Sequence, residues 1–69
     1  MGEDIIEFTA YAMESYRRIK KMSGKEVAAF FESNKLYDFV ERQYGLLHIE
    51  GPEANAIVID EYVASLMIQ

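Results

Sequence analysis

Apolar residues recur every three or four positions between Glu3 and Lys21, and this is the period of one face of an α-helix. The stripe consists of Ile5, Phe8, Ala12, Tyr16 and Ile19, and Ile6 and Met13 are expected to widen it. Acids occupy the first turn and bases the last, as the helix dipole favours. Such a helix is nearly 30 Å long at about 1.5 Å per residue, so the remainder of a 69-residue chain must pack along it.

We expect three more helices, over residues 24 to 33 or 34, 36–44 and 52–67. Ser23 and Glu26 have the spacing of a capping box at the start of the second helix. Asn34 tolerates the left-handed conformation in which helices often end. Gly45 is the expected C-terminal cap of the third helix, and Pro52 suits the first turn of the fourth.

These patterns predict an all-α fold in a single domain over residues 1–69. The predicted architecture is a compact bundle of about four helices, in which a long first helix serves as spine for two short middle helices and a C-terminal helix. The alternative is a strand at Ala56–Ile59, because Ile and Val favour sheets. Its one candidate partner is Leu46–Ile49, so we expect helices throughout.

Composition and charge exclude several classes of function. The chain has no Cys and one His, so we expect no disulfide, no metal site and no cofactor. No apolar run approaches 18 residues and the acidic N-terminus does not look like a signal peptide, so we expect no membrane span and a cytoplasmic location. The net charge of −5 disfavours nucleic-acid binding.

The only histidine, His48, lies in the segment Tyr44–Gly51, which follows no single period. Imidazole can act as a base, a ligand or a pH sensor. We favour a structural role, in which the ring hydrogen-bonds a backbone group at the bend and fixes the last helix against the first. The alternative is a small-molecule or nucleotide site that uses His48 and Tyr44, with Arg17 or Arg18 on a phosphate.

The remaining acidic residues suggest no catalytic pair. Asp60 and Glu61 are adjacent, so on a helix they point about 100° apart. We expect both on a solvated face. Because no Ser or Cys accompanies His48 in a strained turn, the sequence shows no converging catalytic set, and we expect no enzymatic activity.

Two surfaces are candidates for binding a protein. The bases Arg17, Arg18, Lys20 and Lys21 complement the helix dipole, but they also form a docking patch for an acidic partner. Ile57, Met67 and Ile68 lie off the apolar stripe of the last helix, and Met67 with Ile68, near the same end, form a candidate patch for self-association, including a homodimer. Tyr11 and Tyr37 are expected at the surface, as candidate interface contacts.

A helix-turn-helix in residues 23–44 is a second alternative, and it would make the protein a DNA-binding regulator. The recognition helix would carry Lys35, Tyr37, Asp38, Glu41, Arg42 and Gln43. Its two acids would face phosphates, so DNA binding is disfavoured.

Several short motifs occur in a fixed order along the chain: Ile-Ile-Glu-Phe at 5–8, Met-Ser-Gly-Lys-Glu-Val at 22–27, Tyr44, Leu47, His48, Gly51 and Ile-Asp-Glu-Tyr at 59–62. In these motifs the chain resembles a small bacterial family catalogued as domain of unknown function 3791. Family members usually have Thr after the His, where this chain has Ile49. The resemblance implies a compact bacterial domain, often encoded beside a family similar to ADP-ribosyltransferase toxins.

The leading functional hypothesis is therefore a non-enzymatic helical module that binds another protein or itself. The resemblance suggests an antitoxin or accessory partner of a toxin. The candidate interaction residues are Arg17, Arg18, Lys21, Met67 and Ile68, and the signature residues of the resemblance are Tyr44, Leu47, His48 and Gly51.

Overall fold

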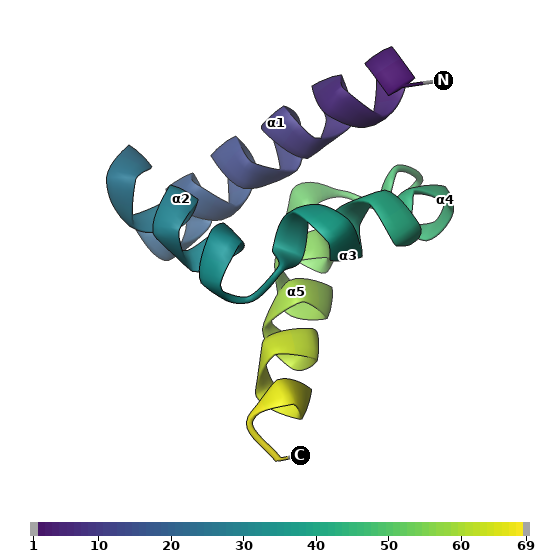
Figure 1. The fold of residues 1–69 in the computed structure, drawn as a ribbon. Helices are drawn as coiled ribbons and strands as arrows, with labels where there is room; N and C mark the ends of the chain where they lie inside the picture. Colours follow the sequence, from purple (N-terminus) through teal and green to yellow (C-terminus); the bar gives the residue numbers. More distant parts are fainter. Residues whose placement is uncertain (1, 69) are drawn as a thin grey trace.

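The computed structural model of the chain describes residues 2–68, which form helices and no strand (Figure 1). The helices are α1 (Gly2–Lys20), α2 (Gly24–Ser33), α3 (Leu36–Arg42), α4 (Tyr44–Leu47) and α5 (Pro52–Leu66). The predicted all-α class is confirmed. The four predicted helices are present, and the described residues form one additional helix, α4, which is a single turn long. Among the helices of residues 2–68, none combines the length and apolar content that a membrane crossing requires.

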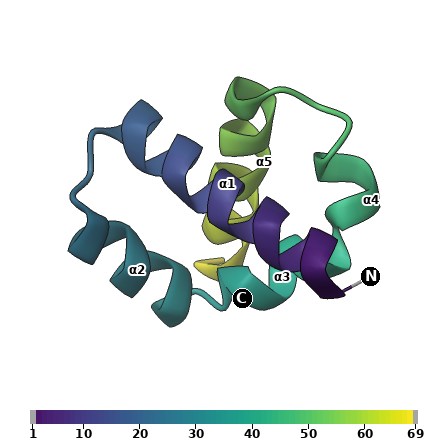
Figure 2. The same ribbon diagram turned by 90° about the horizontal axis from the view of Figure 1, so that it is seen from above.

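Helix α1 is the spine, as its length predicts. Its 19 residues extend about 28 Å at 1.5 Å per residue, close to the longest dimension of the molecule, 32 Å. It packs against α5, α2 and α3. Seen from above, α1 lies across α5, with α2 on one side and α4 on the other (Figure 2).

The core lies beneath α1 and takes residues from all five helices. The buried apolar residues are Ala12, Tyr16, Val27, Phe31, Leu36, Phe39, Val40, Leu47, Ala56 and Ile59. Ile6 does not widen the buried stripe as expected, because it is 70% exposed and lies toward α3 rather than over the core. Tyr11 and Tyr37 are exposed, as expected.

Tyr16 joins three helices. Its ring stacks on Phe30 at 5.6 Å and meets Phe31 edge-on, both from α2. Its hydroxyl donates a hydrogen bond to Asp60 Oδ1 of α5 at 2.6 Å, and Lys20 Nζ donates to Asp60 Oδ2 at 2.8 Å. Asp60 keeps 42% of its side chain exposed and so lies on a solvated face as expected, but the crossing of α1 over α5 also joins it to Tyr16 and Lys20, which the sequence did not predict.

The start of α2 confirms the predicted capping box. Ser23 Oγ accepts from the Glu26 N–H, and the Glu26 carboxylate accepts from the Ser23 N–H. At its end, the left-handed residue is Lys35, with φ 56°, instead of Asn34. Asn34 keeps a negative φ because its side-chain amide donates to the carbonyl of Phe30 at 3.0 Å.

The predicted end of the third helix is wrong. Helix α3 ends at Arg42, and Gly45 lies inside α4 with no positive φ, so it is not a cap. The break at Gln43 changes the direction of the chain and places Leu47 in the core, where none of its surface is exposed. Burial of Leu47 is the physical reason for the additional turn.

We predict that Tyr16→Phe lowers the free energy of unfolding by about 1–2 kcal/mol, because it removes the hydrogen bond to Asp60 and keeps the ring. In a domain of this size this corresponds to a melting temperature lower by about 7–14 °C. Thermal unfolding followed by circular dichroism measures it. Tyr11→Phe is the matched control and should stay within about 0.5 kcal/mol of the wild type. Equal effects of the two changes would contradict the assigned link.

The same link predicts acid sensitivity. Partial burial raises the pKa of Asp60, but hydrogen bonds from Lys20 and Tyr16 outweigh it, so the pKa is lowered overall. Because the pKa of Asp60 is lower in the folded state than in the unfolded state, its ionised carboxylate stabilises the fold at pH values above the unfolded-state pKa. This stabilisation is lost as the pH falls through the folded-state pKa. Denaturant unfolding between about pH 5 and pH 2 should show a smaller loss of stability in Asp60→Asn than in the wild type. An identical loss would show that Asp60 is not responsible.

Candidate functional site

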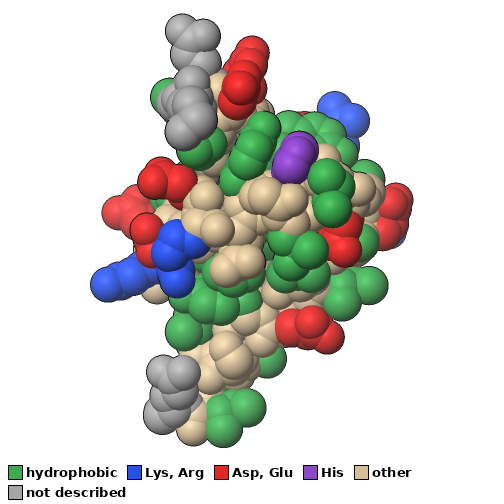
Figure 3. Space-filling view, turned by 90° about the vertical axis from the view of Figure 1, so that its right-hand side faces the viewer, with side chains coloured by type: hydrophobic (Ala, Val, Ile, Leu, Met, Phe, Trp, Pro, Cys, Tyr) green, Lys and Arg blue, Asp and Glu red, His purple; other side chains and the backbone are tan. Residues whose placement is uncertain are grey.

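His48 lies at the surface of the molecule. Figure 3 shows its side chain in purple, with apolar side chains beside it. Nδ1 is 2.7 Å from the carbonyl oxygen of Tyr44, one turn earlier. Because a carbonyl only accepts, Nδ1 carries the proton, and in the neutral ring Nε2 is left with its lone pair toward solvent. The predicted hydrogen bond to the backbone is therefore confirmed.

The other half of that prediction is wrong, because His48 does not itself fix α5 against α1. The imidazole stacks on the ring of Tyr44, with centroids 4.6 Å apart and an interplanar angle of 2°. Tyr44 in turn meets Phe8 of α1 edge-on at 5.3 Å. Tyr44 thus connects this segment to the spine, and His48 stacks on Tyr44.

The two other signature residues of this segment have structural positions. Leu47 is fully buried in the core. Gly51 is the N-cap of α5, with extended backbone (φ −78°, ψ 171°), directly before Pro52. Neither presents a polar group around which a ligand site could form.

Two open grooves flank α1 on either side, and neither contains His48 or Tyr44. The α1–α5 groove, about 380 Å³, is lined by Tyr11, Glu14, Ser15, Arg18, Ile19 and the first turn of α5. The α1–α3 groove, about 290 Å³, is lined mainly by apolar side chains, with Glu41 at its rim. Phe8, which contacts Tyr44, precedes Arg17 by about 14 Å along the helix. The structure therefore does not bring His48 and Tyr44 together with Arg17 or Arg18.

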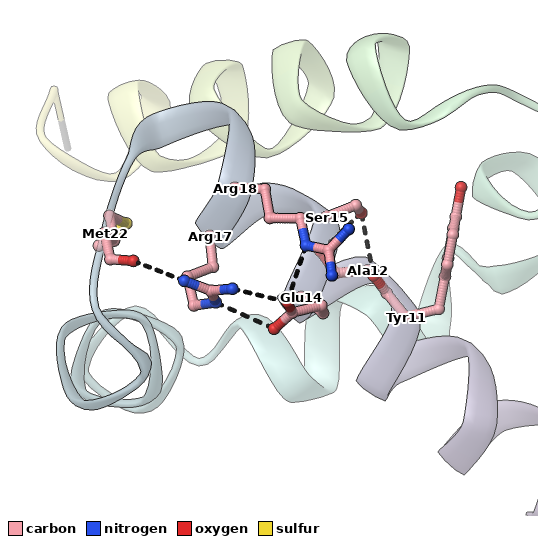
Figure 4. A network of polar contacts seen from close by, with 7 residues as sticks. All are labelled: Tyr11, Ala12, Glu14, Ser15, Arg17, Arg18 and Met22. Carbon is pink, nitrogen blue, oxygen red and sulfur yellow. Dashed lines mark hydrogen bonds and ion pairs between the residues drawn. The ribbon is translucent and has the colours of Figure 1, made fainter.

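Arg17 and Arg18 of α1 form a network around Glu14 (Figure 4). Arg17 donates to both oxygens of Glu14, at 2.9 and 2.7 Å, and also to the carbonyl of Met22. Arg18 donates through Nε alone, at 2.9 Å. Hydrogen bonds from Arg17 and then Arg18 lower the pKa of Glu14 to about 2, so it remains ionised at neutral pH.

Lys20 and Lys21 differ in their surroundings. Lys20 pairs with Asp60, as described above. Lys21 is exposed and has a left-handed backbone conformation, with φ 57°. The backbone N–H of Met22, the next residue, donates a hydrogen bond to the carbonyl of Arg17. This is the closing bond of a Schellman motif, so Lys21 terminates α1. Of the predicted basic patch, Arg18 and Lys21 are the bases that remain available to a partner.

The end of α5 carries the apolar patch that the sequence predicts. In Figure 1, the C-terminal turns of α5 extend past the other helices. Met67 and Ile68 follow them and are 82% and 84% exposed, whereas Ile57, 59% exposed, lies in the first half of α5. The arrangement is a protruding apolar end, and the exposed acid Glu61 lies earlier on the same helix.

Sequence reasoning missed Asn55. Its side chain is 2% exposed, and neither polar atom of its amide hydrogen-bonds a described residue. A buried amide without partners costs free energy. The one sequence signal for this buried amide was an Asn between two alanines near the start of an apolar helix.

Within residues 2–68, no three His, Asp or Glu side chains are arranged to hold a metal ion.

We predict that His48→Ala lowers the free energy of unfolding by less than about 1 kcal/mol, because the ring is exposed. Leu47→Ala, its buried neighbour, should cost about 2–5 kcal/mol. Chemical denaturation of the two variants under the same conditions gives the comparison. A cost for His48→Ala as large as that for Leu47→Ala would return the imidazole to a scaffolding role.

The chain matches no curated protein and no solved structure. Residues 7–65, nearly its whole length, match a family described as "Protein of unknown function (DUF3791)". This range includes α2 to α4 and most of α1 and α5, with the Tyr44–His48 stack. The chain belongs to this family.

Proposed function

We propose that the protein is a non-enzymatic interaction module that binds another protein through the exposed end of α5. The observation that carries the proposal is the apolar tip, Met67 and Ile68, at the end of a helix that extends beyond the body. Contiguous apolar surface of this kind marks interaction sites more often than isolated apolar residues do.

The composition of α5 supports this proposal. Between Pro52 and Leu66, apolar residues occur on all sides of the helix, and a helix of this type is normally covered on all sides. Here the core takes Ala56 and Ile59, while Ile57 stays exposed on another side. A partner would cover the surface that the domain itself leaves open.

The charge of the chain indicates the partner's chemistry. The molecule has a net charge of −5, and the charged residues of α5 are all acidic: Glu53, Asp60 and Glu61. Complementarity favours an apolar surface with a basic rim. The resemblance to a bacterial family encoded beside ADP-ribosyltransferase-like proteins suggests such a protein as the partner. In this proposal, the module acts in the cytoplasm as its antitoxin or accessory subunit.

The test is binding of the protein encoded beside this one, measured by calorimetry after co-purification. Met67→Asp with Ile68→Asp should weaken the complex at least about tenfold, because it places charge in the apolar contact. Ile49→Asp is the matched control, since Ile49 is 72% exposed but belongs to the loop after α4. Wild-type affinity is expected for the control.

Two outcomes would contradict the proposal. One is the absence of any complex with the neighbouring protein. The other is a complex that loses affinity equally in the α5 double variant and in the Ile49 control, since the contact would then lie elsewhere.

A further inference from the structure

The outer face of α1 is uncovered along its length (Figure 2). Exposed residues recur on it at alternating spacings of three and four: Asp4, Glu7, Tyr11, Glu14, Arg18 and, just after the helix, Lys21. These spacings place the five residues within α1 on one line along the helix, as in the contact seam of a two-stranded coiled coil, and Lys21 follows just beyond the end of that line. The line is a candidate helix-pairing face, which we call the α1 seam.

The α1 seam is divided by charge. Asp4 and Glu7 make its first half acidic, and Arg18 and Lys21 make its second half basic. Glu14 does not cancel the basic half, because Arg17 already binds both of its oxygens. Arg18 is 74% exposed in its side chain and uses only Nε toward Glu14, so its two terminal nitrogens remain for another carboxylate.

This division makes the seam complementary to itself in one orientation. If two copies of α1 pair antiparallel, positions 4, 7 and 11 of one copy lie opposite positions 21, 18 and 14 of the other. Two-fold symmetry repeats each contact, so both acids of each copy meet bases. A parallel pair would bring like charges together, and a partner of a single charge would be repelled by half of the seam.

Apolar surface lies at the middle of the same face. Tyr11 is 47% exposed and borders the α1–α5 groove together with Ile19 and Pro52. A helix laid along the seam would cover this groove. We propose that the α1 seam binds a second copy of this chain in an antiparallel, two-fold symmetric dimer. This contact uses a different surface from the end of α5 and holds or fails independently of the proposed function.

The first test is sedimentation of the full chain over concentrations up to about 1 mM, which covers weak association. Because exposed ion pairs are screened by salt, the dissociation constant should rise at least about tenfold from low to high ionic strength. A strict monomer at low salt over the whole range, or a dimer indifferent to salt, would overturn the proposal. This measurement needs no variant.

The second test exchanges the charges. Asp4→Lys with Glu7→Lys makes the whole seam basic, and Arg18→Glu with Lys21→Glu makes it acidic. Each variant alone should be monomeric, and an equimolar mixture should form a heterodimer, because every opposing pair is again of opposite sign. Circular dichroism confirms that each variant is folded.

The matched control is Lys25→Glu with Glu32→Lys, which also exchanges exposed charges but on α2. It should dimerise as the wild type does. A mixture of the two seam variants that stays monomeric, or variants that each dimerise alone, would show that the seam is not the contact.

Discussion

The fold depends on how Tyr16 is held at the crossing of α1 and α5. Its ring lies between the core and α2, while its hydroxyl reaches Asp60 at 2.6 Å. Burial and the adjacent carboxylate raise the pKa of Tyr16 far above its usual range, so the phenol remains a donor. Lys20 supplies the opposite charge to Asp60. The Tyr16 hydroxyl thus links the two longest helices through a carboxylate that stays half-exposed and is paired with Lys20.

The histidine segment is organised by packing. Leu47 must be buried, so the chain breaks after Arg42 and forms the separate turn α4. This turn brings Tyr44 against Phe8, and the His48 ring stacks on Tyr44 while its Nδ1 bonds the backbone carbonyl of Tyr44. Nε2 of His48 has no hydrogen-bond partner among the described residues, and neither groove beside α1 is lined by this ring.

The molecule presents two surfaces of different character. The end of α5 is apolar and protrudes, and it suits a partner that covers Met67 and Ile68. The outer face of α1 is charged in two halves and suits a copy of itself, with the Arg18 side chain 74% exposed. These surfaces lie on different helices. A dimer through α1 would therefore leave both α5 ends open, and each could bind one partner molecule.

The sequence by itself determined the helical class, the capping box at Ser23, the start of α5 and the exposure of Met67 and Ile68, because these follow from local period, caps and turn chemistry. It also predicted the backbone bond of His48. Tertiary structure alone decided the break before α4, the burial of Asn55 and the place of Asp60. Each of these depends on residues far apart in the chain. The hydrogen bond from Tyr16 to Asp60 spans 44 positions, and no local pattern specifies the angle at which α1 crosses α5.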